Sequence, residues 1–443
     1  MPLDYTLPFA LGLLATLVGL LSFLGRSLTR AAFFLLRRPA ARLRRSTLAL
    51  LLAIVGAFAA LLTLRIKGAT LEHAATDLVM IQAPRPARAV TPPSPYLLLA
   101  GDLHCHVSPP DWSEHVARGL SDTIAIARAE GLDFISLMPH VFSRFHADPV
   151  KRAQVERMIG ELRDRVLARP ADGLLIDIGI EYVDPTGHVG MVLGDVTAAL
   201  AAAPIDISRT RPAAFFDAFA EQGGILVVHH PLLTPIPTRL SLTSLDISWQ
   251  PFTGRPPFLP EIAAVDARAE GFEAANLFVR AARDRFLLGD PEHSTRRILA
   301  LLDQQIHQRA RRMTPVGGTD SHSFHLRPMT FVLAEQRSIV GVRDAIHAGR
   351  TCVVAPAACT LEARRAGDSA FLPVGSSIIG VTRLEARARG AAIVIVRDGE
   401  RVAAPADGDI VTIDVDPARC TLIRATVDGG YSAPVYVNCP FAE

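Results

Sequence analysis

The chain has 443 residues, 49% of them hydrophobic and 20% charged, and its formal net charge is +2. This length allows one large domain, a smaller one and a membrane anchor. Seven arginines near the N-terminus exceed the net charge by themselves, so the rest of the chain is slightly acidic and gives no reason to expect a nucleic acid as the main partner. The sequence has no glycine-rich phosphate loop, no basic strip interleaved with aromatic residues and no dinucleotide fingerprint, so nucleotide-binding folds of these kinds are not indicated.

Two apolar runs without charged residues open the chain, at residues 7–24 and 48–64. Each is close to the roughly 20 residues that a helix needs to span a bilayer, so residues 1–70 are predicted to form a two-helix transmembrane hairpin. A secretory signal peptide followed by a buried helix is the alternative, but positive charge follows the first run instead of preceding it. The loop between the runs carries Arg26, Arg30, Arg37, Arg38, Arg42, Arg44 and Arg45.

Short arginine-rich loops stay in the cytoplasm, so both ends of this hairpin are expected on the outer side of the cell membrane, although Arg65 and Lys67 argue the other way. Residues 71–96, which are rich in proline near their end, are expected to be a linker. The rest of the chain would then be extracytoplasmic, in the periplasm or on the outer face, with an α/β domain over residues 97–354 and a smaller domain over residues 355–443.

The segment Asp102-Leu103-His104-Cys105-His106 follows an apolar run that is typical of a buried β-strand. Side chains alternate along a strand, so His104 and His106 are predicted to share one face while Cys105 points the other way. Two imidazoles on one face are the start of a transition-metal site, with two satisfied polar residues at a strand end as the equal alternative.

Further histidines and carboxylates follow other apolar runs that are predicted strands. Helices are predicted between these strands, at residues 122–130, 150–168, 212–222, 294–311 and 340–348. This alternation indicates a parallel β/α architecture, and we expect a closed barrel whose active face lies at the carboxyl ends of the strands. The polar residues at the ends of these runs are His140, Glu181, His188, His230, Asp320 and His322.

These motifs resemble those of the PHP family of metal-dependent phosphoesterases, whose fold is a distorted (β/α)7 barrel. The resemblance covers roughly residues 97–354. The family's first motif stands here at residues 102–112 and keeps both histidines and Asp111, while Pro139 replaces the aspartate of the second motif, ahead of His140. The other motifs stand as Gly179-Ile180-Glu181, Gly187-His188, His230-Pro231 and Thr319-Asp320-Ser321-His322.

Carried over residue by residue, the resemblance implies two to three divalent transition metals, namely zinc, manganese or iron. Imidazole and carboxylate ligands without thiolate suit these metals, and a bridging carboxylate holds two cations close together. One metal would be held by His104, His106, Glu181 and Asp320, a second by Glu181, His188 and His230, and a third by Asp111, His140 and His322.

The resemblance implies hydrolysis of a phosphoester by a hydroxide that bridges two metals. Asp320 would hold the nucleophile or carry its proton, and His322 or His140 would protonate the leaving group. Arg144 and Arg327 follow ligand strands and are expected to bind an anionic small-molecule substrate, with surface salt bridges as the alternative. A hydrolase of carboxylic esters, carbamates or amides is the alternative within this fold. A non-catalytic, metal-dependent sensory or binding module is the alternative of a different class.

Short alternating runs separated by Asp/Gly turns predict a small β-sandwich over residues 355–443. The closing run, residues 433–438, resembles the last strand of the CehA/McbA-type branch of the PHP family, which carries such a sandwich. Five cysteines leave at least one thiol free outside the cytoplasm, and Cys105 is the expected odd one. The other four could form the pairs Cys352 with Cys359 and Cys420 with Cys439, or all could be small buried hydrophobic residues.

Other histidines are expected to be structural. His229 precedes His230 in the predicted strand, so alternation turns its side chain to the opposite face. The histidines in helical or loop contexts are expected at the surface, and these are His115, His146, His293, His307, His325 and His347.

Overall fold

The computed structural model describes residues 56, 90–113, 116–169, 173–184, 187–203, 205, 213–231, 267–277 and 293–441. The chain divides into two compact units, Met1–Leu71 and Glu72–Glu443, and apart from Gly56 all described residues belong to the second. The predicted membrane hairpin and most of the predicted linker lie outside these residues, so they stay predictions. Within the described part of the chain, no helix is both long enough and apolar enough to cross a membrane.

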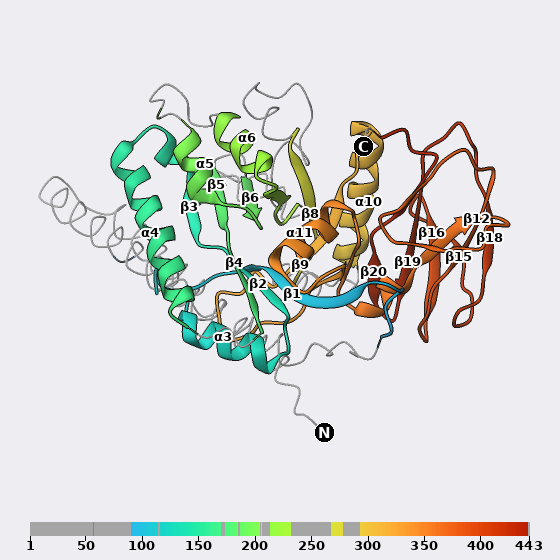
Figure 1. Cartoon of the computed structure of the whole chain (residues 1–443), viewed down its shortest axis with the longest axis horizontal. Helices are drawn as coiled ribbons and strands as arrows, with labels where there is room; N and C mark the ends of the chain where they lie inside the picture. The colour runs from blue at the N-terminus through green and yellow to red at the C-terminus, as the bar shows by residue number, and fades with distance from the viewer. Residues whose placement is uncertain are drawn as a thin grey trace, which may run out of the picture. The chain divides into compact units, whose positions relative to one another are not determined.

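The fold is α/β, as the sequence predicts, and its first half is built on two sheets with helices around them (Figure 1). The first sheet has the order β4-β2-β1-β10-β11, and the second has the order β3-β5-β6-β7-β8-β9. The strands of the first sheet are β1 (Leu97–Cys105), β2 (Phe134–Leu137), β4 (Leu175–Ile178), β10 (Thr330–Ala334) and β11 (Thr351–Val353). Those of the second are β3 (His140–Phe142), β5 (Ile180–Asp184), β6 (Gly187–Val192), β7 (Ile225–Val228), β8 (Ala269–Asn276) and β9 (Thr314–Gly318).

The two sheets are joined on both sides. On one side, two strands of the first sheet continue along the chain into strands of the second, and on the other side the segment after β9 is hydrogen-bonded to β1. Strand β2 continues into β3 after two residues, and β4 continues into β5 after one. At the other side, the residues after β9 pair with the end of β1, where the Asp320 amide donates to the His104 carbonyl at 2.8 Å and Ser321 bridges Cys105. The carboxyl ends of most of these strands therefore meet around one point.

The prediction of a parallel arrangement is wrong at β6 and at β10. Strand β6 pairs antiparallel with both β5 and β7, and strand β10 pairs antiparallel with both β1 and β11. Only two residues separate β5 from β6, and so short a connection can form only a hairpin, which is antiparallel. The pairs β1 with β2, β2 with β4, β3 with β5, β7 with β8, and β8 with β9 are parallel.

Five predicted helices are present, with ends within two residues of the prediction. Their starts have clear local causes: the Asp148 carboxylate accepts hydrogen bonds from the first amides of α4, and the Ser338 hydroxyl caps α11. The helices are α3 (Leu120–Ala129), α4 (Pro149–Leu167), α6 (Ala213–Glu221), α10 (His293–Arg309) and α11 (Ile339–His347), with the shorter α5 (Val196–Ala202) and the 3-10 helices η2 (Ser143–His146) and η3 (Pro356–Thr360) in addition.

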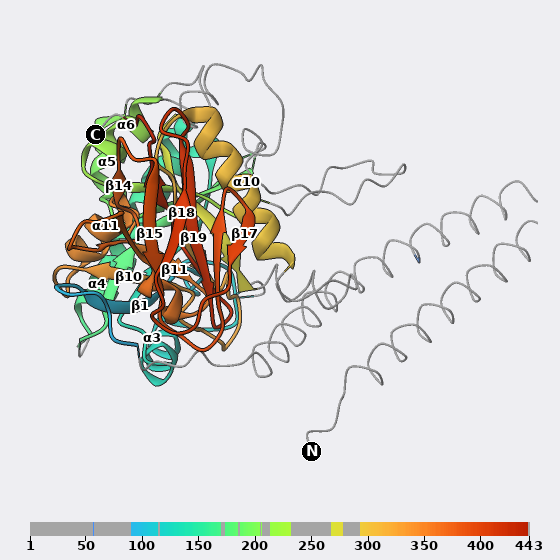
Figure 2. The same ribbon diagram turned by 90° about the vertical axis from the view of Figure 1, so that its right-hand side faces the viewer.

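The C-terminal part of the chain is rich in strands, which lie together beside α10 in Figures 1 and 2. One sheet has the order β13-β12-β15-β18, and side chains from it share an apolar core with β16, β19 and β21. Its strands are β12 (Glu362–Arg365), β13 (Leu372–Pro373), β15 (Arg383–Arg387) and β18 (Val411–Asp414). The facing strands are β14 (Ser377–Ile378), β16 (Ile393–Arg397), β17 (Glu400–Ala403), β19 (Thr421–Val427), β20 (Gly430–Ser432) and β21 (Val435–Val437).

This β-rich part is not separate from the first half of the fold. Strand β20 pairs with β11, so the sheet that contains β1 continues without a break into β19 and β21. The Arg424 guanidinium on β19 also pairs with the Asp303 carboxylate on α10, and both side chains are buried. The boundary predicted between residues 354 and 355 stays a prediction.

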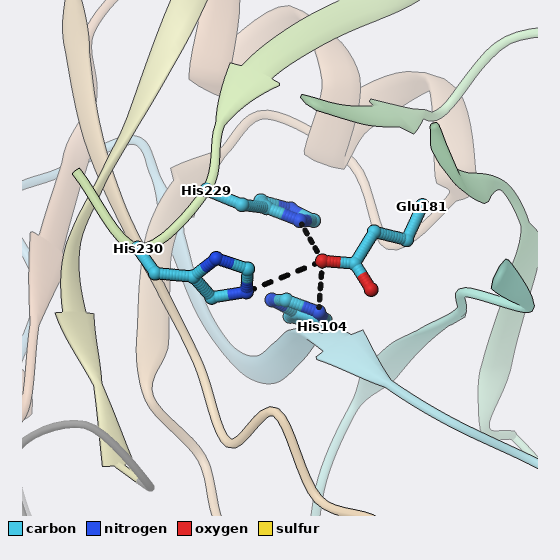
Figure 3. Close-up of side chains that lie close together, drawn as sticks. All are labelled: His104, Glu181, His229 and His230. Carbon is cyan, nitrogen blue, oxygen red and sulfur yellow. Dashed lines mark hydrogen bonds and ion pairs between the residues drawn. The ribbon is translucent and has the colours of Figure 1, made fainter. Parts of the chain in front are cut away.

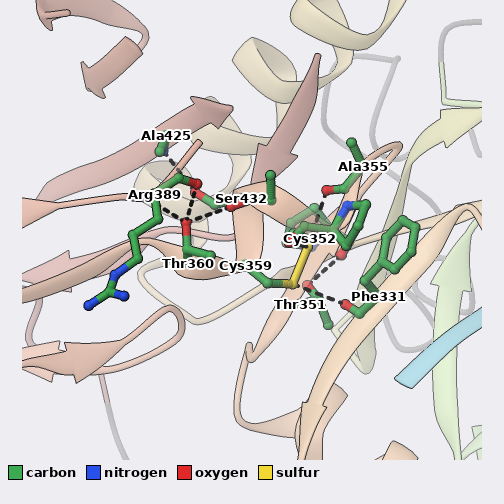
Figure 4. Close-up of a disulfide and its surroundings, with 12 residues drawn as sticks. Phe331, Thr351, Cys352, Ala355, Cys359, Thr360, Arg389, Ala425 and Ser432 are labelled. Carbon is green, nitrogen blue, oxygen red and sulfur yellow. Dashed lines mark hydrogen bonds between the residues drawn. A yellow bond between two sulfur atoms is a disulfide. The ribbon is translucent and has the colours of Figure 1, made fainter. Parts of the chain in front are cut away.

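The four cysteines of the last hundred residues form the two predicted pairs. Cys352 on β11 is bonded to Cys359 on η3 (Figure 4), so this bridge joins a strand to a short helix instead of two strands. Cys420 is bonded to Cys439 across the ends of β19 and β21. Cys105 is free and buried, as expected.

Candidate metal centre

Histidines and carboxylates from six of the strands converge where the sheets meet. His104 ends β1, Glu181 lies on β5, His188 lies on β6, and Asp320 follows β9. Nearly all are buried, which is unusual for ionisable side chains unless they are paired or bind a metal. Every metal ligand predicted from the sequence lies in this cluster, which consists of His104, His106, Asp111, His140, Glu181, His188, His229, His230, Asp320 and His322.

Glu181 is the hub of the cluster. Its Oε1 atom lies 2.8 Å from His188 Nδ1 and 3.2 Å from His230 Nε2, and 3.5 Å from His104 Nε2. Figure 3 shows the rings of His104, on β1, and of His230, shortly after β7, pointing at this oxygen. The other oxygen, Oε2, faces His106 Nε2 at 3.5 Å. One carboxylate therefore faces two groups of imidazoles, as a bridging ligand must.

His104 and His106 flank a second carboxylate, Asp320. Its Oδ1 atom lies 3.4 Å from His104 Nε2 and 3.3 Å from His106 Nε2. Among the described residues these two nitrogens are buried without a hydrogen bond. A buried polar atom without a hydrogen bond is costly, and the ligand atoms of His104, His106 and Asp320 lie within 4.8 Å of one another, so two imidazoles and a carboxylate are available to one divalent transition metal.

A third group of ligand atoms consists of His106, His140 and His322. The ring of His106 stacks between those of the other two, at centroid distances of 4.2 and 4.3 Å. Asp111 was predicted as a metal ligand here, but its oxygens face the outer nitrogens of two rings: Oδ1 lies 3.0 Å from His140 Nδ1, and Oδ2 lies 3.2 Å from His106 Nδ1. In this arrangement Asp111 orients the two rings, as carboxylates beside metal-bound histidines do.

The prediction that His229 faces away from the cluster is wrong. Its Nδ1 lies 3.3 Å from Glu181 Oε1, and its ring stacks on that of His104 at 3.8 Å (Figure 3). The alternation fails because β7 ends at Val228 and His230 has a φ of +37°, so the chain turns and both side chains reach inward. Burial and the nearby His104 lower the pKa of His229 to about 4. The ring is therefore neutral at pH 7, which is the form that binds a metal.

Two buried residues on β8, Glu273 and Asn276, belong to the site and were not predicted. Glu273 Oε1 lies 2.9 Å from His104 Nδ1, and Oε2 accepts the His230 amide at 2.8 Å. The Asn276 amide donates to Glu273 Oε2 and to Asp320 Oδ2, both at 3.1 Å. The signal in the sequence is Glu273 between Phe272 and two alanines, because an acidic residue buried in a strand has to serve a partner.

The backbone at the cluster is held by buried polar side chains. Asp102 accepts hydrogen bonds from the amide and the hydroxyl of Thr319, which ties β1 to the segment that carries Asp320. Arg118 is fully buried and donates to the His106 carbonyl and to the Ser321 carbonyl, each at 3.0 Å. These bonds fix the two segments that present His106 and Asp320.

For His140, Glu181 and Asp320, the neighbouring side chains of the cluster shift the pKa in the direction opposite to the effect of burial. Burial would lower the pKa of His140, but hydrogen bonds with Asp111 and Glu181 raise it to about 10. Burial would also raise the pKa of Glu181 and Asp320, but the neighbouring imidazoles hold both well below the usual range of a carboxyl group. The two carboxylates are therefore stabilised by positive charge beside them. Either protons on the imidazoles or a bound metal ion can supply that charge.

Cys105 takes no part in the cluster. It lies between the two histidines in sequence, but its Sγ donates to the Ser136 carbonyl at 3.3 Å, on the other face of β1. Burial, with the nearby Asp102, raises the pKa of this thiol to about 12. The donor set is thus imidazole and carboxylate without thiolate, as predicted.

The two arginines predicted to bind substrate lie in different surroundings. Arg144 on η2 is exposed and lines a cavity that also touches His140. Arg327 is buried, a few residues after His322. Their role in substrate binding stays a prediction.

No protein-family model matches this chain, and no curated protein sequence matches it. Among solved structures, the chain is similar to a crystal structure from Bacteroides vulgatus, described as a two-domain protein containing a predicted PHP-like metal-dependent phosphoesterase. The two chains are 17% identical, the match covers 80% of this chain and 99% of the other, and the TM-score is 0.39.

Proposed function

We propose that this chain is a metal-dependent hydrolase with a PHP-type active site, and that phosphoesters are its leading substrate class. The single observation that carries this proposal is the buried cluster around Glu181 and Asp320, in which the Nε2 atoms of His104 and His106 have no hydrogen bond. A cluster that only stabilised the fold would not need so many ionisable side chains in contact, because the burial of charged side chains is costly. The sequence motifs of the PHP family at the same residues support the proposal.

Bound metals would lower the pKa of a water and stabilise negative charge on the oxygens of the substrate. His104, His106, Glu181 and Asp320 would hold the first metal, and Glu181 would share a second with His188 and His230, joined here by His229. His106, His140 and His322 offer ligands for a third. The closing run of the sequence resembles the CehA/McbA-type branch, which also includes hydrolases of other esters, so carboxylic esters, carbamates and amides are the alternative substrates.

The residues of the cluster have distinct roles in this reaction. Asp320 is fixed by the Asn276 amide through Oδ2, and its Oδ1 faces His104 and His106, so beside a bound metal this carboxylate would hold the attacking water or take its proton. His322 or His140 would protonate the leaving group, and both side chains are partly exposed, at 18% and 9%.

The proposal is tested with the full-length protein on a phosphomonoester, a phosphodiester and an aryl carboxylic ester. We expect activity on at least one of them, loss after metal removal by a chelator, and recovery with zinc, manganese or iron. Asp320→Asn should lower turnover by roughly a hundredfold to a thousandfold, since it removes a charge from the reacting centre. Asp344→Asn, at an exposed site on α11, is the control and should leave turnover unchanged. Full activity of the Asp320→Asn variant, or of the metal-free protein, would contradict the proposal.

A further inference from the structure

A cavity of about 490 Å³ lies beside the metal centre, and its walls come from one stretch of chain. His140 on β3 forms the wall nearest the cluster, Arg144 on η2 lies next to it, and Lys151 and Gln154 on α4 face them. The volume is within the range of pockets that hold small organic molecules. Because His140 Nε2 lies 3.1 Å from Glu181 Oε2, the cavity begins where the cluster ends.

The lining of this cavity includes positively charged side chains and no negatively charged one. Arg144 and Lys151 contribute two cations to the lining, and none of the nine lining residues is acidic. Arg144 is exposed and has no ion pair with a described residue, while Lys151 lies 3.6 Å from Asp148 in a half-exposed pair that contributes little. An anionic group would therefore gain two charged partners without displacing a strong internal ion pair.

The rest of the lining is largely apolar. Five of the nine residues are hydrophobic, including Phe142 and Met158, so the cavity suits a molecule with an apolar body as well as a charge. Exposed aromatic residues are uncommon, and two lie at this end of the site: Phe142 is 52% exposed, and Trp112 is 47% exposed with its ring 5.7 Å from that of His140. Such residues at the mouth of a polar centre favour an apolar or aromatic ligand.

From this geometry, and resting on the proposed function, we infer that the cavity binds the organic part of the ester substrate, and that this part carries a second anionic group on an apolar frame. The scissile ester would lie at the cluster and the second anion between Arg144 and Lys151. A phenyl ester with a carboxylate on its ring is the simplest molecule with these properties.

The first experiment compares phenyl phosphate with 4-carboxyphenyl phosphate as substrates of the full-length protein. We expect the double variant with Arg144→Gln and Lys151→Gln to lower kcat/KM for the carboxylated ester roughly tenfold, and to change that for phenyl phosphate less than about twofold. Arg157→Gln, at an exposed position of α4 outside the cavity, is the matched control and should change neither. An equal effect of the double variant on both esters, or none on either, would overturn the inference.

The second experiment needs no turnover, so it separates the cavity from the proposed function. Naphthalene-2-sulfonate, an anion on an apolar frame, is titrated into the metal-free protein and the heat of binding is measured. We expect binding to weaken several-fold in the double variant and to stay unchanged in Arg157→Gln. Equal binding by all three proteins would overturn the inference, even if both esters are hydrolysed. Hydrolysis of neither ester would leave the titration to decide the inference alone, and the proposed function would then depend on the phosphodiester and the aryl carboxylic ester.

Discussion

Glu273 connects more of the candidate ligands than any other residue outside the ligand set. Its carboxylate contacts the outer nitrogen of His104 and the backbone amide of His230, and through Asn276 it is linked to Asp320. Burial would raise the pKa of Glu273, but His104 and the other nearby histidines lower it to about 2, so the group is charged at neutral pH. A charged acceptor at His104 Nδ1 keeps the proton on that atom and leaves Nε2 free for a metal.

We predict that Glu273→Gln weakens metal binding by roughly tenfold to a hundredfold while the protein stays folded, because the ring of His104 loses its charged partner. Metal affinity is measured by competition with a chelating dye. Glu270→Gln is the matched control, since Glu270 lies on the same strand and its carboxylate pairs with His347 away from the cluster. Equal affinities in the two variants would show that Glu273 has no such role.

The sequence indicates the candidate ligands that follow predicted strands, but it does not indicate the inward position of His229 or the contacts of Glu273. His104, His106 and Asp320 were found because alternation and family motifs both indicate them. His229 was misplaced because a turn with positive φ at His230 breaks the alternation, and nothing in the two letters His-His reveals that turn. Glu273 was missed because it belongs to no quoted motif, and because Glu270 stands on the same strand, where it pairs with His347 instead.

At the level of secondary structure, the helices were predicted well and the directions of β6 and β10 were not. The helices have apolar residues at helical spacing and clear starts, such as Asp148 before Pro149. The sequence Asp184-Pro185-Thr186-Gly187, at the start of the reversed strand β6, is typical of a hairpin turn, and the prediction did not take it into account. The short helix η2 was not predicted, and with it the position of His146 was misjudged.

His146 was expected at the surface, but it is buried against the rings of Phe145 and Phe215. Burial, and then the positive charge of Arg152, lower its pKa to about 3. This group takes up a proton below pH 6.5 only when the chain unfolds, so its contribution to stability is complete above pH 6.5 and is lost as the pH falls towards 3.

We therefore predict that His146→Phe removes part of the acid sensitivity of the fold. Between pH 7.5 and pH 5, the stability of the variant relative to the original protein should rise by about 1 to 2 kcal/mol, as one group stops titrating. Urea unfolding of both metal-free proteins at the two pH values gives this difference. A difference that does not change with pH would show that His146 is protonated equally in the folded and unfolded chain.

For the molecule as a whole, the order of elements was predictable and the joining of distant segments was not. The sequence indicates a mixed α/β part followed by a β-rich part, and both are present. Strand β11 pairs with β20, and Asp303 forms a buried ion pair with Arg424. These segments are far apart in the sequence, and no sequence pattern indicates that they pair with each other. The transmembrane hairpin and the outer location of the site depend on residues outside the described part of the chain, so they stay predictions.

The central claim is that Glu181 joins two groups of histidines into one centre with at least two metals. It is tested most directly by measuring the metal content of the purified full-length protein and of Glu181→Ala by elemental analysis. Glu161→Ala, at an exposed position of α4, is the control and should keep the original content. We predict at least two transition-metal ions per chain in the original protein and loss of most of them in Glu181→Ala, because both metals lose a ligand. An unchanged metal content in Glu181→Ala would contradict the account.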